Sequence, residues 1–441
     1  MKYMRFKGII IIVAFFAGFG ANAQEVLTKS QAIAMALEKN FNIKIAKNNI
    51  DIAQANATKE NLGFNPTLNA TAGANYNIDN SKAIFQDGRE VQLNFAASNN
   101  ASTALSLNYV IFDGFNRQFN LQRNLETLSA TQLNARFALE NVVLQLFNAY
   151  YEIARIEVDT ESLVDVLSIS KERLERVKVS YDYGVSTLLD ISNAEVDVNT
   201  DSIALLNQNQ LLTNARHDLN FIINSDILDD FIVETEVIFS SQLSKEELID
   251  GLKISNVNLL LAASNIRLSE IDQQLASTSR LPTVSVNGDY GLNRTQNNSA
   301  SFLDRANSNG FTGGLSVNWA VFDGGRRRVQ EQNAKITKLN QKLNYDLAYQ
   351  QIVRDFENAW TIYQNRLTIW KALEQNVITS KLNFDRSEEK YRLRQISNID
   401  FRQAQSNYII SLTSRNKAKY DAKLSEIQVY STAGKIQEVI Y

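Results

Sequence analysis

The chain has 441 residues, with 45 Lys and Arg against 48 Asp and Glu, no Cys, one His and two Pro. Without Cys and with a single imidazole, it lacks the residues for disulfide scaffolds, thiolate metal sites and His-based metal clusters, so we expect no cofactor, no metal and no covalent chemistry. The mildly acidic balance gives no basis for nucleic-acid binding, and the scarcity of proline, which makes up about 5% of average proteins, predicts long helices.

The N-terminus indicates export. Three basic residues precede an apolar run, Gly8–Gly20, which is followed by Ala21-Asn22-Ala23. This pattern predicts a cleaved signal peptide at residues 1–23, because the run is shorter than the roughly 20 residues that span a bilayer as a helix. No later stretch is apolar and long enough to do so, and we therefore expect any membrane insertion to use β-structure.

The rest of the chain is a duplication. Matching segments lie 216 residues apart early in each copy and 210 residues apart later. The clearest pairs are Leu27-Thr28-Lys29 with Leu243-Ser244-Lys245, Pro66 with Pro282, Phe112-Asp113-Gly114 with Phe322-Asp323-Gly324, and Asp190 with Asp400. We predict a first repeat at 24–225, a linker at 226–242, a second repeat at 243–430 and a C-terminal tail at 431–441.

Each repeat opens with a helical pattern. Thr28 with Gln31, and Ser244 with Glu247, have the spacing of the capping box that begins a helix. The apolar residues that follow keep helical spacing, and we expect each first helix to continue until its proline, because proline cannot be accommodated inside a helix.

After each proline the hydrophobic period changes to two. Apolar and polar residues alternate in two predicted β-hairpins, at about 66–113 and about 282–323. Each strand should span about 10 residues with one polar face. The segments between the paired strands, near 78–101 and 293–310, are rich in Asn and Ser without periodicity, which predicts loops.

Very long helices follow the hairpins. Apolar residues spaced alternately four and three apart continue over residues 115–183 in the first copy and recur in the second. A helix of that length extends roughly 100 Å at 1.5 Å per residue, longer than a compact globule can enclose. We therefore predict antiparallel coiled-coil hairpins, bent at Tyr183-Gly184 and near Arg394.

The four strands are too few to stand alone in a membrane. A transmembrane barrel needs at least about eight strands to close, and open sheet edges are not tolerated in lipid, so several chains must share one barrel. Tyr76 and Tyr290 near the loop ends, and Tyr109 and Trp319 near the helix ends, are typical of its aromatic girdles. A soluble two-layer sheet is the alternative, but it leaves the long helices unexplained.

At this point the sequence resembles a known family. The segments around Phe112-Asp113-Gly114 and Phe322-Asp323-Gly324-Gly325, and the tip Tyr183-Gly184-Val185-Ser186-Thr187-Leu188-Leu189-Asp190, look like the TolC family of outer-membrane efflux channels. The resemblance implies an α+β membrane protein: a homotrimer whose coiled-coil helices form a periplasmic α-barrel and whose strands form a 12-stranded transmembrane β-barrel. It also implies contact with outer-membrane lipid and two partners, a periplasmic membrane-fusion adaptor and an inner-membrane pump of the RND or ABC type.

The resemblance also assigns roles to the helix tips, where the family closes its tunnel. The implied gate candidates are Asp190, Asp400, Tyr181, Tyr391 and Arg394. The implied adaptor-docking positions are Gly184, Val185, Ser186, Gln395 and Ser397. The second tip departs from the family: Arg394 stands where glycine is usual, and Ile396 and Gln403 replace charged gate groups, so Arg392, Arg394 or Arg402 could pair with an aspartate instead. Alternatively, Asp190 and Asp400 only cap the returning helices.

The expected function is therefore an exit duct in the bacterial outer membrane, serving a tripartite efflux or type I secretion system. Two alternatives stay open. One is a periplasmic coiled-coil scaffold or adaptor that forms no channel. The other, within the channel class, is an outlet for secreted proteins rather than small molecules.

Overall fold

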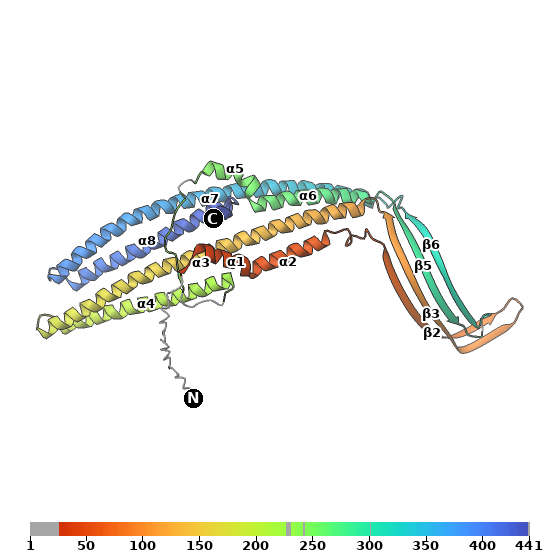
Figure 1. Cartoon of the computed structure of the whole chain (residues 1–441), viewed down its shortest axis with the longest axis horizontal. Helices are drawn as coiled ribbons and strands as arrows, with labels where there is room; N and C mark the ends of the chain where they lie inside the picture. The colour runs from red at the N-terminus through yellow and green to blue at the C-terminus, as the bar shows by residue number, and fades with distance from the viewer. Residues whose placement is uncertain (1–25, 226–230, 241–242, 300, 440–441) are drawn as a thin grey trace, which may run out of the picture.

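The computed structural model describes residues 26–225, 231–240, 243–299 and 301–439, so the predicted signal peptide lies outside the described residues. The molecule is elongated, with helices at one end and a β-sheet at the other (Figure 1). Its elements in chain order are β1 (Val26–Leu27), α1 (Lys29–Lys39), α2 (Phe41–Asn56), β2 (Thr67–Ile84), β3 (Glu90–Phe112), α3 (Asn116–Asp182), α4 (Leu188–Ile223), β4 (Ile232–Val233), α5 (Lys245–Ser255), α6 (Val257–Thr278), β5 (Thr283–Gln296), β6 (Arg305–Asn318), α7 (Arg326–Arg392), α8 (Asn398–Thr432) and the 3₁₀ helix η1 (Ile436–Val439).

The element order confirms the duplication. Each repeat has two short helices, two antiparallel strands, a long helix and a return helix, and the long helices α3 and α7 both contain 67 residues. The predicted linker at 226–242 contributes β4, which pairs in parallel with β1. The predicted tail at 431–441 includes η1, whose Ile436 is buried.

The first helix of each repeat is not continuous, contrary to our expectation. It breaks at Asn40 in the first copy and at Asn256 in the second, where each Asn side chain accepts hydrogen bonds from the first amides of the next helix. Asn40 also donates to the carbonyl of Ile222 at 2.7 Å, and Asn256 to that of Thr432 at 2.8 Å. Each Asn therefore caps one helix and ties it to the return helix of its repeat. In addition, α2 ends ten residues before Pro66.

The strands form a single antiparallel sheet in the order β2-β3-β5-β6. They are longer than predicted, with 18, 23, 14 and 14 residues. Most of the segments predicted as loops, 78–101 and 293–310, are strand. Antiparallel ladders are held by backbone hydrogen bonds, which do not require alternating side chains, so the pairing continues where the alternation stops.

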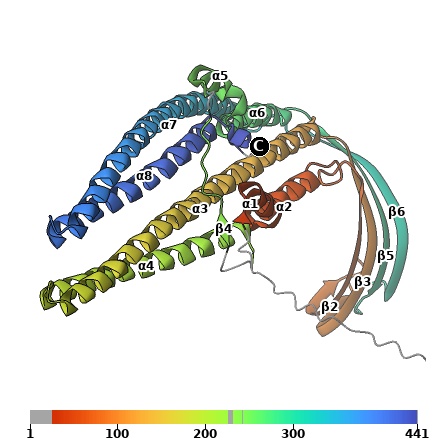
Figure 2. The same ribbon diagram turned by 60° about the vertical axis from the view of Figure 1, so that its left-hand side comes forward.

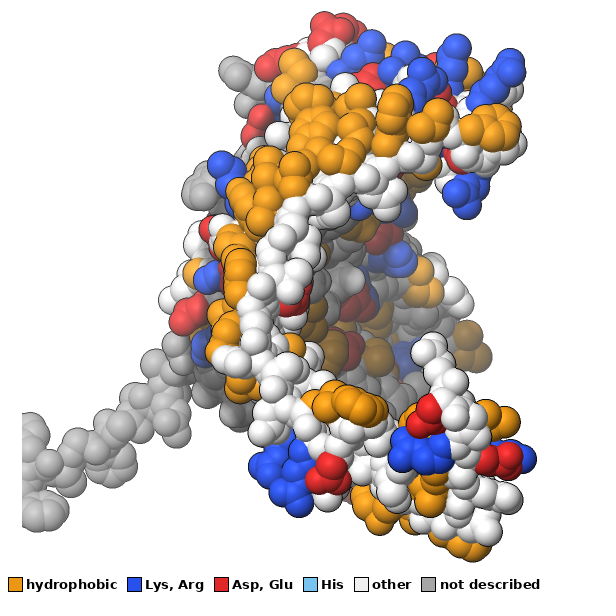
Figure 3. Space-filling view, turned by 90° about the vertical axis from the view of Figure 1, so that its right-hand side faces the viewer, with side chains coloured by type: hydrophobic (Ala, Val, Ile, Leu, Met, Phe, Trp, Pro, Cys, Tyr) orange, Lys and Arg blue, Asp and Glu red, His pale blue; other side chains and the backbone are white. Residues whose placement is uncertain are grey.

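The two faces of the sheet differ. Viewed along the long axis, the sheet is an open arc with hydrophobic side chains gathered along its outer side (Figure 3). Tyr109 is opposite Val286, and Trp319 follows β6 directly, at the helix end of the sheet. Tyr290 lies in the middle of β5. Tyr76 pairs with Asn99, which in turn pairs with Gln296, the last residue of β5, so Tyr76 is level with the end of β5 that is farther from the helices. The aromatic girdles stay a prediction.

The Phe-Asp-Gly segments make the turns from strand to long helix. The Asp113 carboxylate accepts hydrogen bonds from both the backbone N–H and the Nε of Arg117, each at 3.0 Å. Asp323 makes the same two contacts with Arg327, at 2.9 and 3.1 Å. Gly114 has φ +67°, a conformation that favours glycine. The motif is thus explained by a turn that begins a helix.

Near the sheet the helices lie side by side in the order α2-α3-α6-α7; farther away, α4 packs on α3 and α8 on α7 (Figures 1 and 2). The largest buried core lies where α1, β4 and the return helices meet the middle of α3, around Tyr150. Its hydroxyl donates to the Leu27 carbonyl at 2.8 Å and accepts from the Glu234 amide at 2.9 Å. Among the described residues, none of the helices is apolar over a length that would cross a membrane.

Candidate functional site at the helix tips

Both predicted bends are present, and both use a left-handed residue. The first tip turns at Gly184, with φ +70°, and the second at Arg394, with φ +58°. These positions are equivalent in the repeat, being 210 residues apart. The two tips therefore share one backbone conformation, although only the first has the residue type that adopts it without strain.

Asp190 and Asp400 belong to capping boxes. The Asp190 carboxylate accepts from the Thr187 amide at 2.9 Å and the Asp190 amide donates to the Thr187 hydroxyl at 3.2 Å, while Asp400 and Ser397 form the same pair of contacts. The hydrogen bonds that Asp190 accepts from Thr187 lower the pKa of Asp190, and the backbone amide of Thr187 has the larger effect. The hydrogen bonds that Asp400 accepts from Ser397 lower the pKa of Asp400, and the hydroxyl of Ser397 has the larger effect. Both aspartates cap a return helix, as the alternative interpretation expected, and a gating role stays a prediction.

The two tyrosine candidates have different surroundings. Tyr391 is half-buried and stacks on Phe401, with ring centroids 5.0 Å apart. Burial raises the pKa of Tyr391. Tyr181, at the equivalent position, is exposed. The structure thus brings Tyr391, but not Tyr181, into the packing between helices.

The proposed docking positions lie at the surface. Gly184, Val185, Gln395 and Ser397 are exposed, and Ser186 is half-buried.

A charged network joins the two hairpins just above the tips. We call it the inter-hairpin cluster, and it consists of Ser170 and Arg173 on α3, Asp197 and Asp201 on α4, and Arg402 and Gln405 on α8. Arg402 bonds Asp197 and Asp201, each at 3.1 Å, and Arg173 forms an ion pair with Asp197. Among the three arginines considered from the sequence, Arg402 therefore does pair with aspartates, but not with Asp190 or Asp400.

The inter-hairpin cluster is largely shielded from water. Arg173 is 1% exposed and its guanidinium lies 5.5 Å from the centroid of the Phe401 ring. Burial lowers the pKa of Arg173. The Asp201 carboxylate also accepts from the Ser170 hydroxyl at 2.5 Å. Charges in such an environment interact more strongly than at the surface, so the cluster resists separation of the hairpins.

Sequence reasoning missed Arg173, Asp197 and Asp201. A usable signal was present, because Asp197 and Asp201 are four residues apart on one helix face. Like charges at that spacing repel one another, and a facing cation is needed to offset the cost. Arg173, Asp197 and Asp201 are not among the apolar residues of the heptad pattern, and no local pattern identifies the helix that supplies the arginine.

A cleft of about 580 Å³ separates the two tips. Four arginines and two carboxylates are among its lining residues: Arg173, Arg176, Arg392, Arg394, Glu172 and Asp190. Arg392 pairs with Glu388 on its own helix at 2.8 Å, and Arg394 donates to the Ser180 hydroxyl at 3.4 Å. The arginines thus outnumber the carboxylates along this cleft.

Comparisons with known proteins agree on one family. The family model described as outer membrane efflux protein matches residues 32–225 and 248–435. The chain is 23% identical over 395 residues to the outer membrane protein TolC of Vibrio cholerae, covering 88% of this chain and 86% of that protein. It is 19% identical over 441 residues to the outer membrane efflux protein BepC of Brucella suis, covering 99% and 92%. Among solved structures, the outer membrane channel CmeC of Campylobacter jejuni matches with a TM-score of 0.75 at 15% identity, covering 92% of this chain and 86% of that one.

Proposed function

The chain belongs to the outer membrane efflux protein family, and from this premise we propose that three copies form one continuous duct, with a transmembrane β-barrel, a periplasmic α-barrel and a gate at the helix tips. The family membership favours the channel over a periplasmic scaffold. The observation that carries the proposal is two pairs of unpartnered edges in each copy, one pair in the sheet and one pair in the helical layer.

The edges of the sheet support a shared barrel. Within the described residues, β2 and β6 each pair with one neighbour only. Unpaired backbone N–H and C=O groups cost several kcal/mol each in lipid, and four strands cannot curl into a closed barrel. Pairing β2 of one copy with β6 of the next would satisfy both edges, and three copies would give twelve strands.

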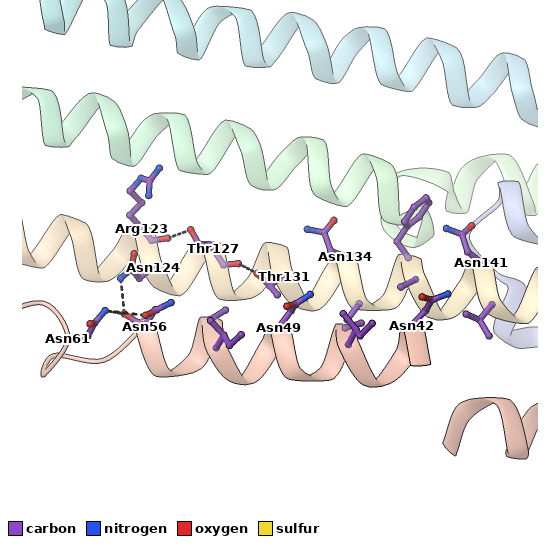
Figure 4. Close-up of a pocket in the computed structure, with 18 of the residues that line it drawn as sticks. Asn42, Asn49, Asn56, Asn61, Arg123, Asn124, Thr127, Thr131, Asn134 and Asn141 are labelled. Atoms are coloured by element: carbon purple, nitrogen blue, oxygen red, sulfur yellow. Dashed lines mark hydrogen bonds between the residues drawn. The ribbon is translucent and has the colours of Figure 1, made fainter. Parts of the chain in front are cut away.

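The helical layer also has two unpartnered edges. On α2, Ile45 is 57% and Ile52 is 60% exposed, and both line a groove of about 860 Å³ between α2 and α3 (Figure 4). On α7, at the opposite edge, Leu339, Leu343 and Leu347 are 53%, 65% and 54% exposed. Isolated chains would leave both apolar stripes in water, whereas association would bury them.

These two stripes lie at the same level along the molecule. A series of side-chain contacts runs across the layer from α2 through α3 and α6 to α7: Asn124 to the Asn56 carbonyl at 2.8 Å, Arg123 to Asp272 at 2.8 Å, and Lys338 to Glu270 at 3.2 Å. The chain runs toward the sheet in α2 and away from it in α3 and α7. The residues of α2 that precede Asn56 and the residues of α7 that follow Lys338 therefore lie at similar distances from the sheet. The stripe on α7 could therefore pack against α2 of the next copy.

Passage and gating follow from the same arrangement. The polar face of each strand would line a water-filled lumen, and the inter-hairpin cluster would hold the tips together until a partner separates them. The exposed tips would meet a periplasmic adaptor, which connects the duct to an inner-membrane pump. No step of this transport requires covalent chemistry.

The absence of native Cys allows a clean test. We would introduce Ile45→Cys and Leu347→Cys together, treat the detergent-extracted protein with a short bifunctional thiol reagent, and expect a ladder that ends at the trimer. The matched control pairs Ile45→Cys with Ile378→Cys, which is 54% exposed but far along α7. Equal cross-linking of both pairs, or a purified protein that stays monomeric and conducts no ions in planar bilayers, would refute the proposal.

A further inference from the structure

We propose that the cleft between the two tips binds an acidic side chain of a protein partner, with Arg394 as its principal cationic contact. This inference rests on the proposed function, because the partner is expected at the tips. It adds the chemistry of recognition: a carboxylate flanked by apolar residues.

Arg394 has a strained backbone conformation that the packing of its side chain does not explain. A non-glycine residue in the left-handed region is strained, because its Cβ lies too close to the following carbonyl oxygen. The equivalent residue, Gly184, adopts the same conformation without a side chain, and the open space around it leaves room for one. Such strain concentrates at functional positions. Within the described part of the chain, the Arg394 side chain makes a single long hydrogen bond, to Ser180, so its packing does not account for a strained arginine.

The guanidinium groups along the cleft have unused capacity for an anion. Among the described residues, Arg394 forms no ion pair, and Arg176 pairs only with Glu172 of its own helix at 3.5 Å. Arg173, which lines the same cleft and is 1% exposed, leaves Nε and Nη1 without a hydrogen-bond partner. Of the two carboxylates that line the cleft, Asp190 is engaged in its capping box and Glu172 pairs with Arg176.

The rim of the cleft is suited to a protein rather than to a free ion. Val185, which lines the cleft, is 54% exposed, and the tips also carry exposed apolar side chains: Tyr183, Leu188, Leu189 and Leu393 are 81%, 65%, 68% and 61% exposed. Arginine and tyrosine are enriched among the residues that dominate protein–protein binding, and both occur at these tips. A small anion would leave this apolar surface in water.

The test uses the full chain in lipid nanodiscs and two fluorescein-labelled peptides. One peptide has a central Glu flanked by Leu residues, and its twin has Gln at the same place. Charge-assisted hydrogen bonds to arginine predict that the Glu peptide binds about tenfold more tightly at low salt. The preference should disappear in Arg394→Asn, since Asn tolerates the left-handed conformation but carries no charge. It should persist in Arg394→Lys and in the control Arg354→Asn, which removes an exposed arginine far from the cleft.

Several results would overturn the assignment: equal binding of both peptides, no binding of either at millimolar concentration, a preference unchanged in Arg394→Asn, or displacement of both peptides equally by inorganic phosphate. The same nanodisc preparations report on the proposed function. If the variants form conducting trimers without any Glu preference, only the cleft assignment fails, whereas protein that forms no conducting trimer contradicts the duct itself.

Discussion

Arg402→Ala tests most directly whether the inter-hairpin cluster holds the tips together. Arg402 bonds Asp197 and Asp201 across the two hairpins, each at 3.1 Å. Its removal leaves Asp201, whose side chain is 10% exposed, with the Ser170 hydroxyl as its remaining partner in the inter-hairpin cluster. Breaking a fully buried pair costs about 3–5 kcal/mol and breaking a surface pair about 0–1 kcal/mol.

The Arg402 side chain is 24% exposed, so an intermediate cost of about 2 kcal/mol per protomer is expected. This value shifts the equilibrium between joined and separated hairpins by about 30-fold in each copy. Single-channel recording in planar bilayers should therefore show a higher conductance or a larger open fraction than in the unmodified protein. Because the cluster is shielded from solvent, the effect should change little with salt.

Arg392→Ala is the matched control. It also removes an arginine near the second tip, but among the residues that the structure describes Arg392 pairs only with Glu388 on its own helix, which is worth about 0.3–0.5 kcal/mol. The reasoning would be refuted if Arg402→Ala conducted like the unmodified channel or if both variants changed conductance equally. A double-mutant cycle with Asp201→Asn should recover a coupling energy of about 1 kcal/mol or more if the two side chains act together.

Three further outcomes follow from the geometry. Asp190→Ala should raise conductance more than Thr187→Ala in bilayers if Asp190 is a gate residue, whereas equal effects would show that only the shared capping box matters. Because the pKa of Asp190 is lowered below its ordinary 3.8, the ionised carboxylate stabilises the start of α4 above pH 3.8, and this stabilisation is lost as the pH falls through the lowered pKa. Hydrogen-exchange protection at the start of α4 should therefore decrease on acidification below pH 3.8, and Asp190→Asn should remove this pH dependence. In thermal unfolding, Gly114→Ala should be clearly more destabilising than Gly324→Ala: both glycines have positive φ, but a Cβ at Gly114 would lie 2.8 Å from the Leu281 Cβ, while Gly324 faces open space.

Regular periodicity made much of the fold predictable. The heptad spacing located α3 within one residue at each end, because a helix that packs along its whole length must repeat its apolar positions. The breaks at Asn40 and Asn256 were missed because the apolar pattern continues through them. The strand lengths were underestimated for a related reason: beyond the apolar part, the pairing depends on backbone hydrogen bonds, which leave little pattern in the side chains.

The tip site was harder to predict, because its contacts join residues far apart in the chain. The capping boxes are local and could be recognised from spacing alone. The contact between Asp201 and Arg402 spans 201 residues, and no local rule relates them. Family resemblance directed attention to Asp190 and Asp400, while the charged contact between the hairpins lies about two to three turns beyond Asp190 along α4, at Asp197 and Asp201.

The internal duplication acts as a control on these assignments. Where the two repeats agree, the residues have a structural role: Asn40 and Asn256 cap equivalent helices, and Asp113 and Asp323 bind equivalent arginines. At the tips, Gly184 and Arg394 share a backbone conformation but differ in charge and strain. A structural requirement would act on both tips alike and would favour glycine in each. The difference therefore points to a requirement that only the second tip meets, and contact with a partner is such a requirement.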